Sequence, residues 1–270
     1  MSTFSERQGL IPSDAEITLR HDAPDWLRSH IIALAYDAGL SPSSLRDYLC
    51  KILLEEPDQS NWSEFPNIDG EVRHLLSNAE WFYVYDLIER IYSKVGGSPN
   101  WEAAADTEAG KFSKEINRAF RQKGVGWQLV CGKIQMRGAE AFEESLRTAI
   151  KLTEQSNRSV ARRELSEALR DLSRRPEPEV TGAIQHAMAA LECIAKDVTS
   201  DPSVTLGAWI KKNPNGFPAP LNIAVEKLWG YASEYGRHVK EGYPASFEEA
   251  EMTVGVAGAL STYLLRKASL

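Results

Sequence analysis

The sequence predicts a mainly α-helical protein, in which an N-terminal helical domain with one small β-hairpin precedes a C-terminal helical bundle. Apolar residues recur at the three-to-four-residue spacing of helices along most of the 270 residues. The alternation of apolar and polar residues that is typical of strands is convincing only within residues 127–136. Because two strands cannot form an independent core, we expect this hairpin to pack on helices.

The N-terminal domain is expected over residues 1–155. Its apolar stripes predict helices between Asp22 and Gly39, from Ser41-Pro42 to about Leu53, over residues 79–95, over residues 111–123 and over residues 139–155. Residues 61–70 read as a polar loop. The segment 79–95 is rich in aromatic residues, which could stack on bases, but its helical spacing favours a buried helix. Cys131-Gly132 separates the runs Trp127–Val130 and Lys133–Met136 and predicts a tight turn.

The C-terminal domain is expected over residues 156–270, as a small bundle of antiparallel helices. Pro176-Glu177-Pro178 interrupts the helical pattern after a basic segment, residues 157–175. Further helices are predicted over residues 180–198, 205–211, 221–235 and 247–267.

Composition limits the functions that the chain can have. Hydrophobic residues make up 43% and charged residues 26%, as in an ordinary soluble globular protein. The net charge of −7 excludes a surface that is basic throughout, so any contact with nucleic acid needs a local patch. The sequence shows no membrane span, signal peptide, phosphate-binding loop or metal-ligand spacing, so neither a metal nor a cofactor is expected. The odd number of widely spaced cysteines predicts free thiols and a cytoplasmic location.

The adjacent pair Arg237-His238 is the main candidate for catalysis. Gly236 is placed to end one helix, and a capping signal, Ser246 with Glu249, opens the next, so the pair is expected on a short connection. Histidine transfers protons near neutral pH, and arginine binds phosphate with two parallel hydrogen bonds. A solvated surface pair is the alternative.

Three further residues are secondary candidates. Arg162 and Arg163 belong to the most basic segment of the chain, which is either an RNA-backbone contact or a solvated face with internal ion pairs. Glu192 lies at the edge of the apolar stripe of segment 180–198 and is a better candidate than His186 on the same segment.

Short motifs along nearly the whole chain resemble a family of bacterial defence proteins. Phe4-Ser5-Glu6-Arg7-Gln8-Gly9 and Gly126-Trp127-Gln128-Leu129-Val130-Cys131-Gly132-Lys133-Ile134 resemble the AbiJ-type N-terminal domain of abortive-infection proteins, as does segment 112–121. Ala187-Met188-Ala189-Ala190-Leu191-Glu192 and the stretch from Gly230 to His238 resemble the HEPN-like helical domain that often follows it.

This resemblance implies a role in phage defence and a metal-independent ribonuclease that works as a homodimer. In such a site His238 would handle protons at the ribose 2′-hydroxyl and Arg237 would hold the phosphate. Ser233 and Lys240, which flank the pair, join Glu192, Arg162 and Arg163 as residues expected to bind RNA or support the site.

The usual HEPN signature has an arginine separated from the histidine by four to six residues, where this chain has Ser233, Ala232 and Tyr231. Two readings follow: either Arg237 replaces that arginine, or the domain binds a protein, RNA or nucleotide without cleaving it. The small residues Gly255, Ala257, Gly258 and Ala259 could form the dimer contact or pack within the bundle.

Overall fold

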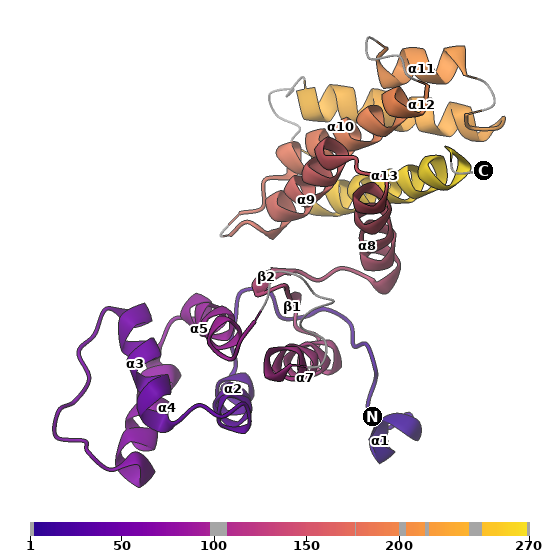
Figure 1. The fold of residues 1–270 in the computed structure, drawn as a ribbon. Coiled ribbons are helices and arrows are strands. Elements are labelled where there is room, and N and C mark those ends of the chain that lie inside the picture. Colours follow the sequence, from indigo (N-terminus) through magenta and orange to yellow (C-terminus); the bar gives the residue numbers. More distant parts are fainter. Residues whose placement is uncertain are drawn as a thin grey trace. The chain divides into compact units, whose positions relative to one another are not determined.

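The computed structural model describes residues 3–97, 107–175, 177–199, 204–213, 216–237 and 245–268. It confirms the predicted fold class: the chain is mainly α-helical, and β1 and β2 are the only strands within those residues (Figure 1). The chain divides into two compact units, Met1–Arg137 and Gly138–Leu270.

Unit 1 buries apolar helix faces around one core. Its described elements are α1 (Phe4–Arg7), α2 (Asp25–Asp37), α3 (Pro42–Leu53), η1 (Glu64–Ile68), α4 (Asp69–Asn78), α5 (Trp81–Lys94), α7 (Glu108–Gln122), β1 (Trp127–Val130) and β2 (Lys133–Met136). The aromatic segment is the buried helix α5, as expected, because Tyr85, Ile88 and Tyr92 on it all lie in the core. A base-stacking role for this helix is therefore wrong for those side chains.

The expected polar loop over residues 61–70 is wrong in part. Its second half forms the π-helical turn η1 and the start of α4. Helix α4 buries only Val72 and Leu76, so its apolar stripe is too short to stand out in the sequence.

The hairpin forms where it was predicted. Trp127 pairs with Met136 and Val130 with Lys133 in an antiparallel register. Cys131 and Gly132 both have positive φ, +50° and +78°, as a two-residue hairpin turn of matching twist requires. Asn117 of α7 ties the hairpin to the helices, since its side chain accepts from Leu129 N–H (2.7 Å) and donates to the Leu129 carbonyl (2.8 Å).

Unit 2 is a helical bundle, as predicted. Its described elements are α8 (Glu140–Gln155), α9 (Ser159–Ser173), α10 (Val180–Thr199), α11 (Leu206–Lys212), α12 (Leu221–Ala232), η2 (Ser233–Arg237) and α13 (Phe247–Ala268). Helix α10 packs between α9 and α13, and α8 packs on α13 and α9 (Figure 1). Because α8 shares this core, the division at Arg137 and Gly138 lies one helix before the boundary that was predicted near Ser156.

The small residues of α13 pack mainly inside unit 2. Ala257 and Gly258 are buried, and a Cβ atom at Gly258 would lie 3.0 Å from Ser145 Oγ of α8. The Ser145 hydroxyl also donates to the Gly255 carbonyl (2.9 Å). Helix α8 therefore covers most of this face, and of the four small residues only Ala259 is exposed. This packing favours the alternative that most of these residues pack within the bundle, and the homodimer stays a prediction.

Candidate functional site

The end of α12 leads the chain toward His238 through a change of helical winding. The α-helix ends at Ala232, and residues 233–237 continue as the π-helical turn η2, which packs against α10. Gly236 therefore does not end the helix in the way that the sequence suggested, because it lies inside this turn. Wide turns of this kind often mark functional sites.

Tyr231 occupies one of the three positions at which the HEPN signature would have an arginine, and Ala232 and Ser233 occupy the other two. The rings of Tyr231 and Tyr235 stack with their centroids 4.7 Å apart. Arg237 closes η2, and its side chain, His238 and Lys240 lie outside what the structure describes. The pairing of Arg237 with His238 accordingly stays a prediction.

Two of the supporting candidates, Glu192 and Ser233, line one cavity between α10 and the end of α12. Its wall is completed by Gln185, Met188, Trp229 and Ala232. The cavity measures about 10 Å³, which is room for at most one water molecule. The cavity is therefore too small to hold a nucleotide.

Glu192 has a structural task at this end of the bundle. Its carboxylate accepts from the Leu206 backbone N–H (3.0 Å) and from Lys196 Nζ (2.9 Å). The first of these bonds satisfies an N–H at the start of α11 that has no partner within the helix. Glu192 thus fixes α11 on α10, and any role in catalysis would be indirect.

Arg162 and Arg163 lie elsewhere in unit 2, on exposed positions of α9. Arg162 pairs with Glu154 (2.9 Å) and Arg163 with Glu164 (3.1 Å), and their side chains are 47% and 66% exposed. Neither lines the cavity at the end of α12. The structure shows the ion pairs of a solvated helix face and leaves the expected RNA contact as a prediction.

His186 is more closely surrounded by charge than the sequence indicated. Its Nδ1 lies 2.7 Å from Glu164 of α9, and its Nε2 lies 3.7 Å from Asp171. Burial raises the pKa of Asp171. Burial also raises the pKa of Glu164, but the hydrogen bonds from His186 and Arg163 outweigh it and leave that pKa below its usual value. The cluster joins α9 to α10 and is a local electrostatic contact.

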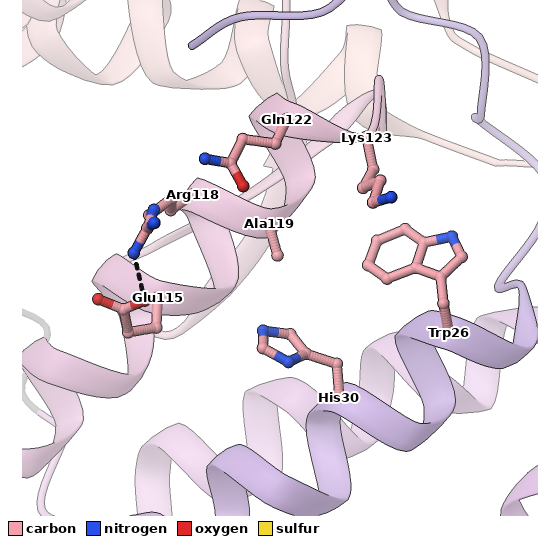
Figure 2. Close-up of a pocket in the computed structure, with 7 residues that line it drawn as sticks. All are labelled: Trp26, His30, Glu115, Arg118, Ala119, Gln122 and Lys123. Atoms are coloured by element: carbon pink, nitrogen blue, oxygen red, sulfur yellow. Dashed lines mark hydrogen bonds and ion pairs between the residues drawn. The ribbon is translucent and has the colours of Figure 1, made fainter. Parts of the chain in front are cut away.

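A larger cavity lies in unit 1, between α2 and α7, and none of the sequence-based candidates belongs to it. It has a volume of about 400 Å³. Figure 2 shows Trp26 and His30 of α2 opposite Ala119 of α7 and Lys123, the residue that follows α7. Glu115, Arg118 and Gln122 of α7 complete the lining. The signal for it in the sequence is weak, because polar residues one turn apart on two helices are typical of any solvated face.

The described residues contain no group of three or more histidine, cysteine, aspartate or glutamate side chains arranged to hold a metal ion. Within the same residues, no helix combines the length and the hydropathy of a transmembrane span.

Comparison with known families decides the assignment of the N-terminal half. A family model described as AbiJ N-terminal domain 4 matches residues 2–152, which is more than half of the chain. The chain belongs to the AbiJ family. No curated protein and no solved structure shows significant similarity to it.

The AbiJ family gives this chain the context of abortive infection, a phage-defence response. The AbiJ domain match includes unit 1 and most of α8, so it ends close to the predicted boundary, whereas the packing of α8 assigns that helix to unit 2. The match does not extend over α9 to α13, and the HEPN-like character of that segment stays a prediction.

Proposed function

We propose that this AbiJ-family protein is an abortive-infection effector whose C-terminal bundle cleaves RNA without a metal ion, using His238 and Arg237. The observation that carries the proposal is the π-helical turn η2, which breaks the α-helical winding directly before His238 and packs on α10. The family context of phage defence supports a target whose destruction stops growth of the infected cell.

The proposed cleavage needs two side chains and neither an oxidant nor a reductant. His238 removes the proton from the ribose 2′-hydroxyl, the 2′-oxygen bonds to phosphorus, and the bond from phosphorus to the 5′-oxygen breaks. The proton that His238 took up passes to the leaving 5′-oxygen, which gives a 2′,3′-cyclic phosphate and a 5′-hydroxyl. Arg237 donates two hydrogen bonds to the phosphate as negative charge builds up.

A non-catalytic HEPN-type binding module is the second candidate, and the stacked tyrosines favour it. Tyr231, one of the positions where an arginine would complete the usual signature, packs its ring on Tyr235. Aromatic rings bind bases by stacking without cleaving the strand. In this reading η2 presents an aromatic surface to a protein, RNA or nucleotide partner.

RNA cleavage by the purified full chain distinguishes the two candidates. Structured and unstructured RNA are incubated with the protein, with and without a metal chelator. We expect cleavage in both conditions, and a loss of about 10²- to 10⁴-fold in rate for His238→Ala. Arg237→Lys should restore only part of the activity that Arg237→Ala loses, because lysine lacks the bidentate fork.

His74→Ala is the matched control, since His74 is an exposed histidine of α4 in unit 1. It should leave the rate unchanged. If His238→Ala and the wild type give the same products, the assigned site is wrong. If every variant binds RNA and none cleaves it, the binding module is the correct reading.

The proposed ribonuclease would work as a homodimer, and the outer face of α13 is the surface that we propose for the contact. Met252 and Val256, one turn apart, are 55% and 40% exposed. Val256→Glu should convert the dimer to a monomer in light scattering, whereas Arg147→Glu on α8 should not. A wild type that is monomeric at tens of micromolar concentration would contradict the dimer.

A further inference from the structure

The cavity between α2 and α7 has the size and the lining of a small-ligand site. Its volume of about 400 Å³ falls within the range of about 300–1,000 Å³ that is usual for such sites. The space exists because Ala119 stands on α7 between Glu115 and Lys123, one turn from each, and presents only a methyl group (Figure 2).

One wall of the cavity has the aromatic ring of Trp26 beside the positive charge of Lys123. The indole of Trp26 is only half-buried, and Lys123 Nζ lies 5.9 Å from the centroid of its ring. A flat aromatic ligand that carries negative charge would contact both groups at once, by stacking and by ion pairing.

The other wall already holds an anion of the protein itself. Arg118 Nε donates to the Glu6 carboxylate (2.8 Å), and the Gln122 side-chain amide donates to the same oxygen. Glu6 belongs to α1 at the N-terminus, and its side chain is only 14% exposed. Arg118 and Gln122 are thus positioned to bind a carboxylate or a phosphate.

Charge and hydrogen-bonding capacity fit a phosphate ester. The Arg118 guanidinium also forms an ion pair with Glu115 (3.3 Å). Lys123 is a second cation that lines the cavity. Between these groups lies His30, whose pKa is lowered by burial, so its ring is neutral at physiological pH. Neither ring nitrogen has a hydrogen-bond partner within the described part of the chain, so both can serve a sugar hydroxyl or a base edge.

We propose that this cavity binds a free nucleoside monophosphate. The base lies against Trp26 above Ala119, and the phosphate replaces the Glu6 carboxylate on Arg118 and Gln122. Binding therefore releases α1 from α7, so the N-terminal segment reports occupancy of the site. The proposal is independent of the cleavage proposed for unit 2.

Titration calorimetry of the full chain with AMP, GMP, CMP and UMP tests this site. At least one nucleotide should bind with a dissociation constant below about 1 mM, the weak end of typical metabolite affinities. Adenosine and inorganic phosphate alone should each bind at least about tenfold more weakly than AMP, because each makes only part of the contacts that AMP makes. Arg118→Gln should weaken binding by about tenfold or more, through loss of a charge-assisted bond.

Ala119→Leu fills the cavity from a helix position that accepts leucine well, and it should abolish binding while the melting temperature is unchanged. Lys114→Gln is the matched control, because it removes one positive charge from an exposed position of α7 outside the cavity. It should leave the affinity unchanged. Glu6→Gln should tighten binding, since it removes the charge that competes with phosphate.

Three outcomes would overturn the proposal. The first is that none of the four nucleotides binds, and the second is that Ala119→Leu binds as well as the wild type. The third is that a short single-stranded RNA binds at this cavity and free nucleotides do not, which would make the site part of an RNA surface.

Discussion

The two units of this protein use their arginines in different ways. In unit 1, arginines reach backbone carbonyls of distant segments: Arg28 donates to Ala23 (2.6 Å), Leu76 and Ala79 (2.8 Å), which ties α2 to the end of α4. In unit 2, the arginines of α9 pair with nearby carboxylates on an exposed face. Arg28 therefore ties two elements of unit 1 together, whereas these α9 arginines make ion pairs on an exposed surface.

The largest expected effect is at Arg137, the most buried charged side chain among the described residues, at 1% exposure. It donates to the carbonyls of Val125 (2.9 Å) and Ala15 (3.3 Å) and pairs with Asp14. Arg137→Met should destabilise unit 1 by about 3 kcal/mol, the lower end for a broken buried pair, because Asp14 is partly exposed and keeps Arg121. Urea unfolding measures this cost.

Arg121→Met serves as the control for Arg137→Met. It removes the other cation near Asp14, whose contact is longer (3.4 Å) and more exposed, and it should cost less than about 1 kcal/mol. Equal costs for the two variants would contradict a special role for the buried arginine.

The second effect concerns Glu71, which holds the loop between α3 and η1. It accepts from Asp58 N–H (2.8 Å), from the Asn61 side chain (3.0 Å) and from Arg46 (3.2 Å). Glu71→Gln should cost about 1.5–3 kcal/mol, because the loop then loses its charged acceptor. Hydrogen exchange of the amides of residues 55–63 would show faster opening of the loop.

The same carboxylate gives the loop a pH dependence of known sign. Burial raises the pKa of Glu71, but these hydrogen bonds and the charge of Arg46 together lower it below the usual 4.5. A depressed pKa stabilises the fold fully above about pH 4.5 and loses that contribution as the pH falls through the folded-state value. Glu71→Gln should remove this acid sensitivity, and acidification that opens the loop by the same increment in both proteins would refute the assignment.

The third effect tests the close helix packing of unit 2. Valine at Gly258 would press its Cβ against Ser145 Oγ (3.0 Å) and Leu146 Cδ2 (3.1 Å) of α8. Gly258→Val should therefore cost about 1–3 kcal/mol in thermal or urea unfolding. Gly230→Val on α12 is the matched control, because nothing lies within 4 Å of a Cβ there, and it should change stability by less than about 0.5 kcal/mol.

The long helices and the hairpin could be predicted from the sequence because their signals are local. Each apolar stripe repeats over several turns, and Cys131-Gly132 marks its own turn. Helix α4 escaped prediction because it buries two apolar residues only. The assignment of α8 to unit 2 could not be foreseen either, since it depends on contacts of Ser145 and Leu146 with α13, far along the chain.

The features of the candidate site also fall into those with a local signal in the sequence and those that depend on distant contacts. The motif Arg237-His238 can be read from neighbouring residues, and so could the capping box of Ser246 and Glu249, which the structure confirms with bonds of 2.7 and 3.2 Å. The structural task of Glu192 depends on a backbone N–H of another helix. The cavity of unit 1 needs Trp26 and Lys123 to meet, and no spacing rule connects two residues on different helices.

The smallest expected effect on stability is at Arg162 and Arg163. Both arginine side chains are largely exposed, so each alanine substitution should change the free energy of unfolding by less than about 0.5 kcal/mol. Their effect on RNA would be larger if α9 binds the backbone. The double variant should then make the slope of log affinity against log salt shallower by about 1.4, because each single-strand phosphate that an arginine neutralises contributes about 0.7 to that slope.

Arg147→Ala on α8 provides the comparison for this test, because Arg147 is 66% exposed and pairs with Glu144 (3.0 Å) in the same manner. Salt titrations of fluorescent RNA binding measure all three proteins. If the slope of log affinity against log salt is the same for the double variant, Arg147→Ala and the wild type, Arg162 and Arg163 only form part of a solvated helix face. The contrast between the units would then be complete, because Arg162 and Arg163 would serve neither the fold nor RNA binding.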